Sequence, residues 1–213
     1  MAESYRLRLL RGLEAMLAGD GCHRVAGVDE AGRGCLAGPV VAAAVLVDPR
    51  RAVPGVDDSK RLGTEERLGL ERAIRSSALA VGCAAVSAEV IDRVNVLEAT
   101  RLAMVRALEG LEPPVDVVLV DAVPLRWHRP CIPLVRGDAW SYAIACASIL
   151  AKCERDRLMA GYDREYPGYG FASHKGYAAP EHRAALSELG PSPIHRLTFR
   201  SVIPRRPSAG SEG

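Results

Sequence analysis

Two adjacent carboxylates, Asp29 and Glu30, stand just before an arginine that is framed by two glycines at 32–34. Apolar residues at 25–27 precede them, and a longer apolar run at 39–47 follows. An unpaired ionised carboxylate is costly to bury, so a strand ending at Asp29 would place both acids where the sheet opens to solvent. The turn could then bring both acids to one side, whereas a continuing strand would send them to opposite faces.

The two glycines let the backbone approach another molecule closely, or adopt positive φ, at little steric cost. We interpret the segment 29–34 as a metal-binding acid pair joined to a loop that contacts a phosphate or a sugar. The alternative is an ordinary strand end whose acids are merely solvated, because short motifs of this kind have many false positives.

The composition is that of a globular protein with an ordinary core. The chain has 213 residues, of which 48% are hydrophobic and 25% charged, enough to bury a core without disulfides or structural metals. The net charge of +2 is too small to argue for nucleic acid by itself. Only three of the 28 basic residues are lysines. These lysines either mark positions where a compact ammonium is needed or were retained by chance.

The cysteines and the chain start indicate a location in the cytoplasm. Six cysteines form no CxxC pair and mostly lie in apolar runs, so they suggest small core residues in a reducing compartment. They form no zinc-type cluster with the five histidines. The N-terminus has no signal-peptide pattern, and no apolar run approaches the length of a membrane span.

Hydrophobic periodicity predicts an α/β fold with a mixed central sheet flanked by helices. The first two strands are joined by a connection short enough for an antiparallel pair. The predicted strands cover 25–29, 39–47, 79–86, 116–121 and 131–135. The predicted helices cover 4–18, 64–77, 88–110 with a possible interruption near Asn95, a long helix opening at 137–138, and 180–189.

Acids recur where these elements begin or end. Asp121 closes a strand as Asp29 does, and Asp138 stands at the predicted start of the long helix, where a negative charge is favoured. In open α/β sheets such edges gather functional sites, so we expect Asp29, Glu30, Asp121 and Asp138 to converge. For Asp121 alone, a simple strand-end acid is an equally good interpretation.

Four carboxylates without histidine or cysteine are hard oxygen ligands, which suits Mg²⁺ or Mn²⁺. Two such ions about 4 Å apart would activate a water and stabilise a leaving oxygen in phosphodiester hydrolysis. Tyr177 offers a face for a sugar or base. Lys152 lies on a helix, where an exposed or structural role is the better interpretation. The basic residues that could hold phosphates are Arg33, Lys60, Lys152 and Lys175.

Several blocks of the chain, from about Val25 to Phe199, resemble bacterial ribonuclease HII, a type 2 ribonuclease H. The blocks, in family order, are VDEAGRGCLAGPVVAAAV, DDSK, NVLEATRLAM, VLVDA, RGDAWSYAIACASILAKCERDRLM, YPGYGFASHKGY and GPSPIHRLTF. The resemblance implies a ribonuclease H-like fold with a small C-terminal helical extension. We therefore expect a catalytic domain over 1–165 and a loop-helix extension over 166–203, in which the Gly-, Tyr- and Pro-rich composition of 166–180 predicts a loop. The Pro, Ser, Gly and Arg content of 204–213 predicts a disordered tail.

The resemblance also implies the activity. The family hydrolyses the RNA strand of RNA–DNA hybrids and cuts 5′ to single ribonucleotides embedded in duplex DNA, leaving 3′-hydroxyl and 5′-phosphate ends. By position, the metal ligands correspond to Asp29, Glu30, Asp121 and Asp138. The loop Gly32-Arg33-Gly34 resembles the segment that reads the ribose 2′-hydroxyl. Tyr177 resembles the residue that stacks on the sugar just beyond the RNA-to-DNA junction, with Lys60 and Lys175 as further substrate contacts.

Three positions depart from the commonest family pattern without removing a ligand: Cys35, Ala122 and Trp140. Trp140, beside Asp138, puts the preference for sequence context in doubt. The C-terminal tail lacks a glutamine-led hydrophobic-aromatic clamp-binding motif, so we predict no clamp partner, no obligate protein partner and a monomer.

Other functions use the same set of acids. Related 3′-to-5′ exonucleases and junction resolvases would lack the glycine-arginine-glycine loop, and a resolvase would ignore a lone ribonucleotide. A hybrid-binding module without catalysis would have lost one of the acids, whereas this chain keeps all four.

Overall fold

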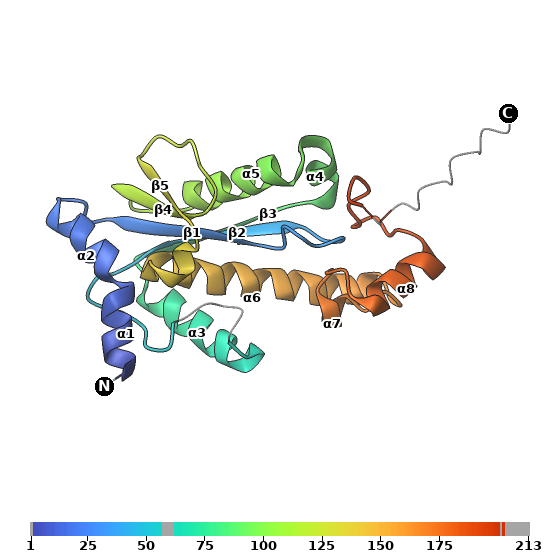
Figure 1. The fold of residues 1–213 in the computed structure, drawn as a ribbon, viewed down its shortest axis with the longest axis horizontal. Helices are drawn as coiled ribbons and strands as arrows, with labels where there is room; N and C mark the ends of the chain where they lie inside the picture. The colour runs from blue at the N-terminus through green and yellow to red at the C-terminus, as the bar shows by residue number, and fades with distance from the viewer. Residues whose placement is uncertain (1, 57–61, 201, 203–213) are drawn as a thin grey trace, which may run out of the picture.

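The computed structural model describes residues 2–56, 62–200 and 202. The predicted substrate contact at Lys60 and the predicted tail at 204–213 lie outside the described residues. Five strands form one sheet in the order β3-β2-β1-β4-β5 (Figure 1). They are β1 (Val25–Ala31), β2 (Val40–Leu46), β3 (Ala80–Val86), β4 (Val117–Asp121) and β5 (Cys131–Leu134).

The sheet is mixed, as predicted. β2 pairs antiparallel with both β1 and β3, whereas β4 pairs parallel with both β1 and β5. The carboxyl ends of β1 and β4 therefore meet at the same edge of the sheet, which is where sites gather in α/β folds.

Helices cover both faces of the sheet (Figure 1). On one face, α5 (Val96–Glu109) packs against β2 and β3, with α4 (Ala88–Val94) just before it in the chain. On the other face, the long α6 (Tyr142–Glu165) runs along β1 and β2, and α3 (Thr64–Ser77) packs on α6. No helix among the described residues is both long and apolar enough to cross a membrane.

A glycine in β1 sets the distance between the sheet and α6. A Cβ at Gly27 would lie 2.1 Å from the backbone carbon of Ala143, so only glycine allows this approach. Around it the strand is fully buried, and the small side chains of Ala26 and Ala43 leave room for helices on both faces. Close packing here brings α6 near the acids of β1.

The long helix starts later than predicted. Gly137–Ala139 form a separate 3-10 turn, η1, and α6 begins only at Tyr142. Ser141 caps α6 because its Oγ accepts a hydrogen bond from the Ile144 N–H at 3.2 Å. Glu14 adds a second cap, since its Oε1 accepts from the Ala143 N–H at 2.9 Å. The prediction that Asp138 opens this helix is wrong.

The single helix predicted over 4–18 is also wrong, because it is divided into α1 (Ala2–Leu10) and α2 (Gly12–Gly19). The break at Arg11 lies beside a contact that its guanidinium makes with the Pro49 carbonyl, and α2 carries Glu14 to the start of α6.

The C-terminal part packs on the far end of α6 (Figure 1). The short α7 (Phe171–His174) lies within the segment predicted to be loop, and α8 (Pro180–Leu189) follows where a helix was predicted. Phe171, fully buried, joins a cluster with Met159 of α6 and Ile194. This cluster fixes the segment that carries Lys175 and Tyr177.

Candidate active site

Asp29 and Glu30 lie inside β1 and not at its end. The strand continues to Ala31, and these two residues pair with Ala43 and Ala42 of β2. The predicted strand end at Asp29 is therefore wrong. Asp29 is only 5% exposed, so the prediction that both acids open to solvent is also wrong.

Asp121 is the neighbour of this pair on the adjacent strand. Val28 of β1 pairs with Val120 of β4, so Asp29 and Asp121 follow at the next position of two parallel strands. Asp121 Oδ1 accepts a hydrogen bond from the Gly137 N–H at 2.6 Å. That bond ties the end of β4 to the turn η1, in which half-buried Asp138 is the next residue.

Burial and mutual repulsion disfavour the ionised form of the β1 acids. Burial is the main cause that raises the pKa of Asp29 well above its usual value, and the charges of Glu30 and Asp121 raise it further. Hydrogen bonds from the Ser148 hydroxyl and the Glu30 N–H oppose this shift only partly. The carboxylates of Asp29, Glu30 and Asp121 are therefore close enough for their charges to repel one another.

Glu30 has one oxygen that no described residue satisfies. Burial raises its pKa as well, although the nearby Arg33 guanidinium, with Nη1 3.2 Å from Oε1, acts in the opposite direction. The second oxygen, Oε2, is buried and has no hydrogen-bond partner among residues 2–56, 62–200 and 202. A buried acceptor without a partner costs about 1–3 kcal/mol, more when charged, so this oxygen is suited to a ligand.

The carboxylate oxygens of these acids fit a hard divalent cation. Buried carboxylates with an unsatisfied oxygen match the all-oxygen coordination of Mg²⁺ or Mn²⁺. Within the described part of the chain, however, no three His, Cys, Asp or Glu side chains are already arranged to hold a metal ion. The structure therefore brings the acids to one edge, and their role as ligands stays a prediction.

Two fully buried arginines, which the sequence interpretation missed, support the loop Gly32-Arg33-Gly34. Arg196 donates to the carbonyls of Gly32 and Arg33, both at 2.7 Å, and to that of Gly38. Arg155 of α6 donates to the carbonyls of Ala37 and Pro39 at 3.1 Å, and to a third carbonyl, that of Lys175.

The loop cannot hold a larger residue at its first position. Gly32 has φ +93°, and a Cβ there would lie 1.9 Å from Nε of Arg155. A local signal for this arginine did exist, because Arg155 continues the buried stripe of Ala147 and Ala151 at four-residue spacing on α6. A charge on that stripe indicates a buried polar contact.

Tyr177 lies where it can touch a ligand. Its side chain is 46% exposed, and the Arg155 guanidinium carbon lies 5.8 Å from the centroid of its ring. The Gly176 carbonyl, next to it, accepts from the N–H of Leu36 at 2.8 Å. The glycine loop region and the Tyr177 segment are thus directly joined.

The two described lysines of the predicted site make contacts within the protein, whereas Trp140 is exposed. Lys152 pairs with Asp156 one turn along α6, Nζ to Oδ1 2.6 Å, which favours the structural interpretation. Lys175 Nζ donates to the Ala172 carbonyl at 2.6 Å, so its ammonium is held within its own loop. Trp140, next but one after Asp138, is 67% exposed.

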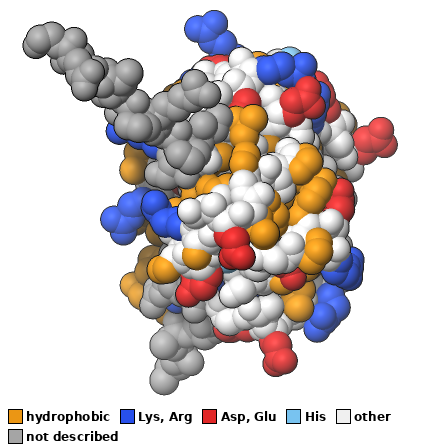
Figure 2. All heavy atoms as spheres, turned by 90° about the vertical axis from the view of Figure 1, so that its right-hand side faces the viewer, with side chains coloured by type: hydrophobic (Ala, Val, Ile, Leu, Met, Phe, Trp, Pro, Cys, Tyr) orange, Lys and Arg blue, Asp and Glu red, His pale blue; other side chains and the backbone are white. Residues whose placement is uncertain are grey.

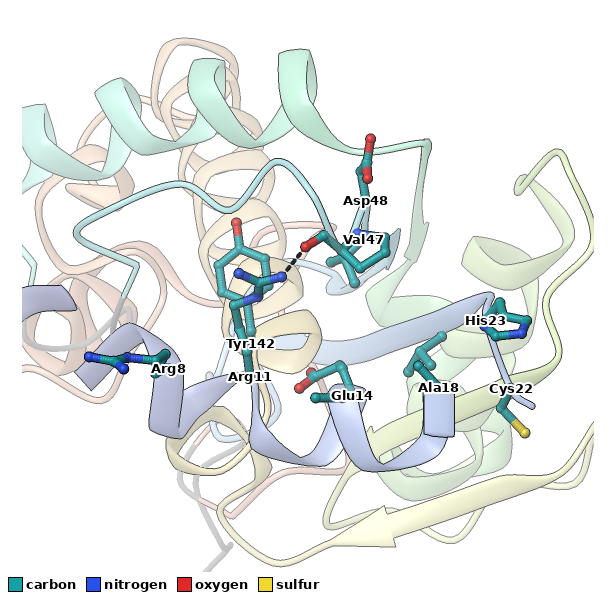
Figure 3. A pocket seen from close by; sticks show the side chains of 12 residues that line it. Arg8, Arg11, Glu14, Ala18, Cys22, His23, Val47, Asp48 and Tyr142 are labelled. Atoms are coloured by element: carbon teal, nitrogen blue, oxygen red, sulfur yellow. Dashed lines mark hydrogen bonds between the residues drawn. The ribbon is translucent and has the colours of Figure 1, made fainter. Parts of the chain in front are cut away.

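A separate cavity of about 320 Å³ lies between α1–α2 and the start of α6 (Figure 3). Arg11, Glu14 and Tyr142 line it, and none of its lining residues is a predicted site residue. At the α8 end of the molecule, hydrophobic side chains lie among both basic and acidic ones (Figure 2). That mixture agrees with the small net charge of +2.

Comparison with known proteins identifies the family. The family model described as ribonuclease HII matches residues 26–202. Ribonuclease HII of Geobacter sulfurreducens is 53% identical over 192 residues, covering 89% of this chain and 88% of that protein. Ribonuclease HII of Syntrophotalea carbinolica is 52% identical over 190 residues, covering 89% and 91%. The crystal structure of ribonuclease H2 from Pyrococcus horikoshii OT3 has a TM-score of 0.71 at 26% identity, covering 84% of this chain and 95% of that one.

These similarities confirm the resemblance seen in the motifs and the predicted ribonuclease H-like fold. The family depends on divalent metal ions, in agreement with the acids found at the edge of β1 and β4. The chain belongs to the ribonuclease HII family and is a hydrolytic endoribonuclease that acts on the RNA strand of RNA–DNA hybrids.

Proposed function

We propose that this nuclease incises duplex DNA 5′ to a single embedded ribonucleotide in the cytoplasm, leaving 3′-hydroxyl and 5′-phosphate ends. Its proposed metal ligands are Asp29, Glu30, Asp121 and Asp138, holding Mg²⁺ or Mn²⁺. The observation that carries the proposal is the buried Glu30 Oε2, which has no hydrogen-bond partner in the described part of the chain and lies near an Asp29 that is costly to ionise. A cation at this edge would compensate both charges.

Divalent ions bound there would supply an activated water and charge stabilisation for the leaving oxygen. The chain's own groups prepare that position. The Gly137 N–H fixes the orientation of Asp121 Oδ1, and the Ser148 hydroxyl does the same for Asp29. Arg33 lies over Glu30 and is itself 41% exposed, so it can also approach a phosphate.

The direction of the loop's backbone supports ribose recognition. The carbonyls of Gly32 and Arg33 point inward to Arg196, and among the described residues no acceptor takes the N–H groups of Arg33 or Gly34. Those two donors are therefore available for a 2′-hydroxyl oxygen, the group that distinguishes RNA from DNA.

Stacking and backbone contacts complete the proposed site. Half-exposed Tyr177 offers an aromatic face for the sugar beyond the junction, and Lys175 remains a proposed phosphate contact. In this proposal the acids come from the domain at 1–165 and Tyr177 comes from the extension at 166–203. Both parts must be present for a lone ribonucleotide to be read.

The experiment compares three labelled duplexes: one with a single ribonucleotide, one RNA–DNA hybrid and one all-DNA control, each with Mg²⁺, Mn²⁺ or a chelator. We expect one cut 5′ to the ribonucleotide that requires a divalent ion. Stepwise shortening from the 3′ end would indicate an exonuclease instead. Binding without cleavage would indicate a hybrid-binding module, and cutting only of four-way junctions would indicate a resolvase.

A further inference from the structure

Three histidines, two of them buried, form a cluster behind Tyr177, outside the group of acids. His182 of α8 and His195 are 0% and 2% exposed, and their Nε2 atoms lie 3.0 Å apart. His174 of α7 stacks on His182 with ring centroids 4.4 Å apart. The mechanism does not use these side chains, so their role must lie elsewhere.

The hydrogen bonds determine which nitrogen of each ring carries the proton. The Ser192 N–H can only donate, at 2.9 Å, so His195 Nδ1 must accept. His195 Nε2 then carries a proton and donates to His182 Nε2. His182 therefore carries its proton on Nδ1, which donates to the Tyr177 carbonyl at 2.7 Å. The carbonyl can only accept, so the assignment is consistent from both ends.

This one-way chain requires both rings to be neutral. A second proton on His182 would set two N–H groups against each other, and one on His195 would oppose the Ser192 N–H. Burial lowers the pKa of His195 to about 4 and also lowers the pKa of His182. The nearby His174 and Arg183 also favour the neutral state, and the ring of Tyr169 packs on His195 with centroids 5.1 Å apart.

The segment at 194–196 links the two substrate-reading parts of the proposed site. Ala37 forms an antiparallel bridge with His195, and the Gly38 N–H donates to the Ile194 carbonyl at 2.8 Å. The next residue, Arg196, holds the carbonyls of the glycine loop. Arg196 therefore fixes the glycine loop, and the preceding residue, His195, fixes the Tyr177 backbone through His182.

We propose that His182 and His195 are positioning residues that hold Tyr177 at a fixed distance from the Gly32-Arg33-Gly34 loop for reading a single ribonucleotide. The pair acts through the Tyr177 backbone and does not touch the reacting atoms. This inference rests on the proposed function and assigns to that site a specificity element outside the acids.

The test measures KM and kcat on the single-ribonucleotide duplex for His182→Leu, alone and combined with Tyr177→Ala. Loss of the bond to the Tyr177 carbonyl should raise KM about tenfold with kcat little changed, the size expected for one lost hydrogen bond, since the carbonyl keeps the bond from the Ala179 N–H at 2.8 Å. In the Tyr177→Ala background the same change should have almost no effect on KM, because the ring that it positions is gone. His128→Leu, at an exposed histidine, is the control and should behave like the unmodified protein.

The inference would be overturned if His182→Leu and Tyr177→Ala raised KM independently, so that the two factors multiplied in the double variant. If His182→Leu does not fold, His182→Asn and His182→Gln replace it. The shorter amide keeps a donor near the Nδ1 position and should retain a low KM, whereas the longer one reaches toward His195 and should not. Equal KM values for these two would also overturn it. Failure of the unmodified protein to cut the duplex would instead refute the proposed function.

Discussion

Removing the guanidinium of Arg196 tests whether this side chain holds the glycine loop. Arg196 is fully buried and donates four hydrogen bonds of 2.7–3.0 Å to the carbonyls of Gly32, Arg33 and Gly38. In Arg196→Met the carbonyls of Arg33 and Gly38 lose their donor, whereas that of Gly32 keeps a bond of 3.4 Å from the Cys35 N–H. Each buried unsatisfied acceptor costs about 1–3 kcal/mol. Burial also lowers the pKa of Arg196 to about 10, so relief of the desolvated charge offsets part of that loss.

The expected net loss is therefore about 2–5 kcal/mol, with the larger value typical when one partner of a buried charged contact is removed. For a protein of this size that corresponds to a Tm lower by roughly 5–15 °C. Urea denaturation gives the free energy of unfolding, provided that the m-value stays unchanged. Arg183→Met is the matched control, because Arg183 is exposed and donates to a single carbonyl, that of Ala178, at 3.3 Å. A loss below about 0.5 kcal/mol for Arg196→Met, the range of surface substitutions, would refute this role.

Three further predictions concern the proposed site. Asp121→Asn should abolish cleavage yet raise the metal-free stability, because it removes a charge that raises the pKa of Asp29. A carboxyl whose folded pKa is raised destabilises the fold most at pH values above that pKa, so the stability gained by Asp121→Asn should shrink as the pH falls through the folded pKa of Asp29. Urea denaturation with a chelator at several pH values measures this gain. A gain that grows toward low pH would contradict the prediction. Tyr177→Ala should impair cutting at an embedded ribonucleotide far more than it lowers Tm, whereas equal losses would indicate a structural role. Binding of the uncut duplex, measured with a chelator by fluorescence anisotropy, should weaken as salt rises, and a flat response would argue against Arg33 and Lys175 as phosphate contacts.

Elements with local signals were predicted well. α3 and α8 have the predicted bounds, because acids in the first turn and a proline at the first position mark their starts. The expected interruption near Asn95 is confirmed, since its side chain accepts from the N–H groups of Leu97 and Glu98 and starts a new helix. The strands differ from prediction by one or two residues at their ends.

Elements that depend on distant partners were predicted poorly. The start of α6 is decided by Glu14, which lies 129 residues before Ala143. Glu30 was expected beyond the end of a strand, but pairing with β2 extends β1 through it to Ala31. In both cases a tertiary contact outweighs the local preference.

The sequence by itself determined the family and the sheet type, because ordered motifs and hydrophobic periodicity are local properties that a linear chain displays. It also supplied the four acids as predicted ligands. Only the tertiary structure decided how the loop and Tyr177 are held. Arg196 reaches the Arg33 carbonyl across 163 residues, and Arg155 reaches the Ala37 carbonyl across 118. Backbone carbonyls are present at every residue and leave no sequence pattern, so these partners become visible only when the chain has brought them together.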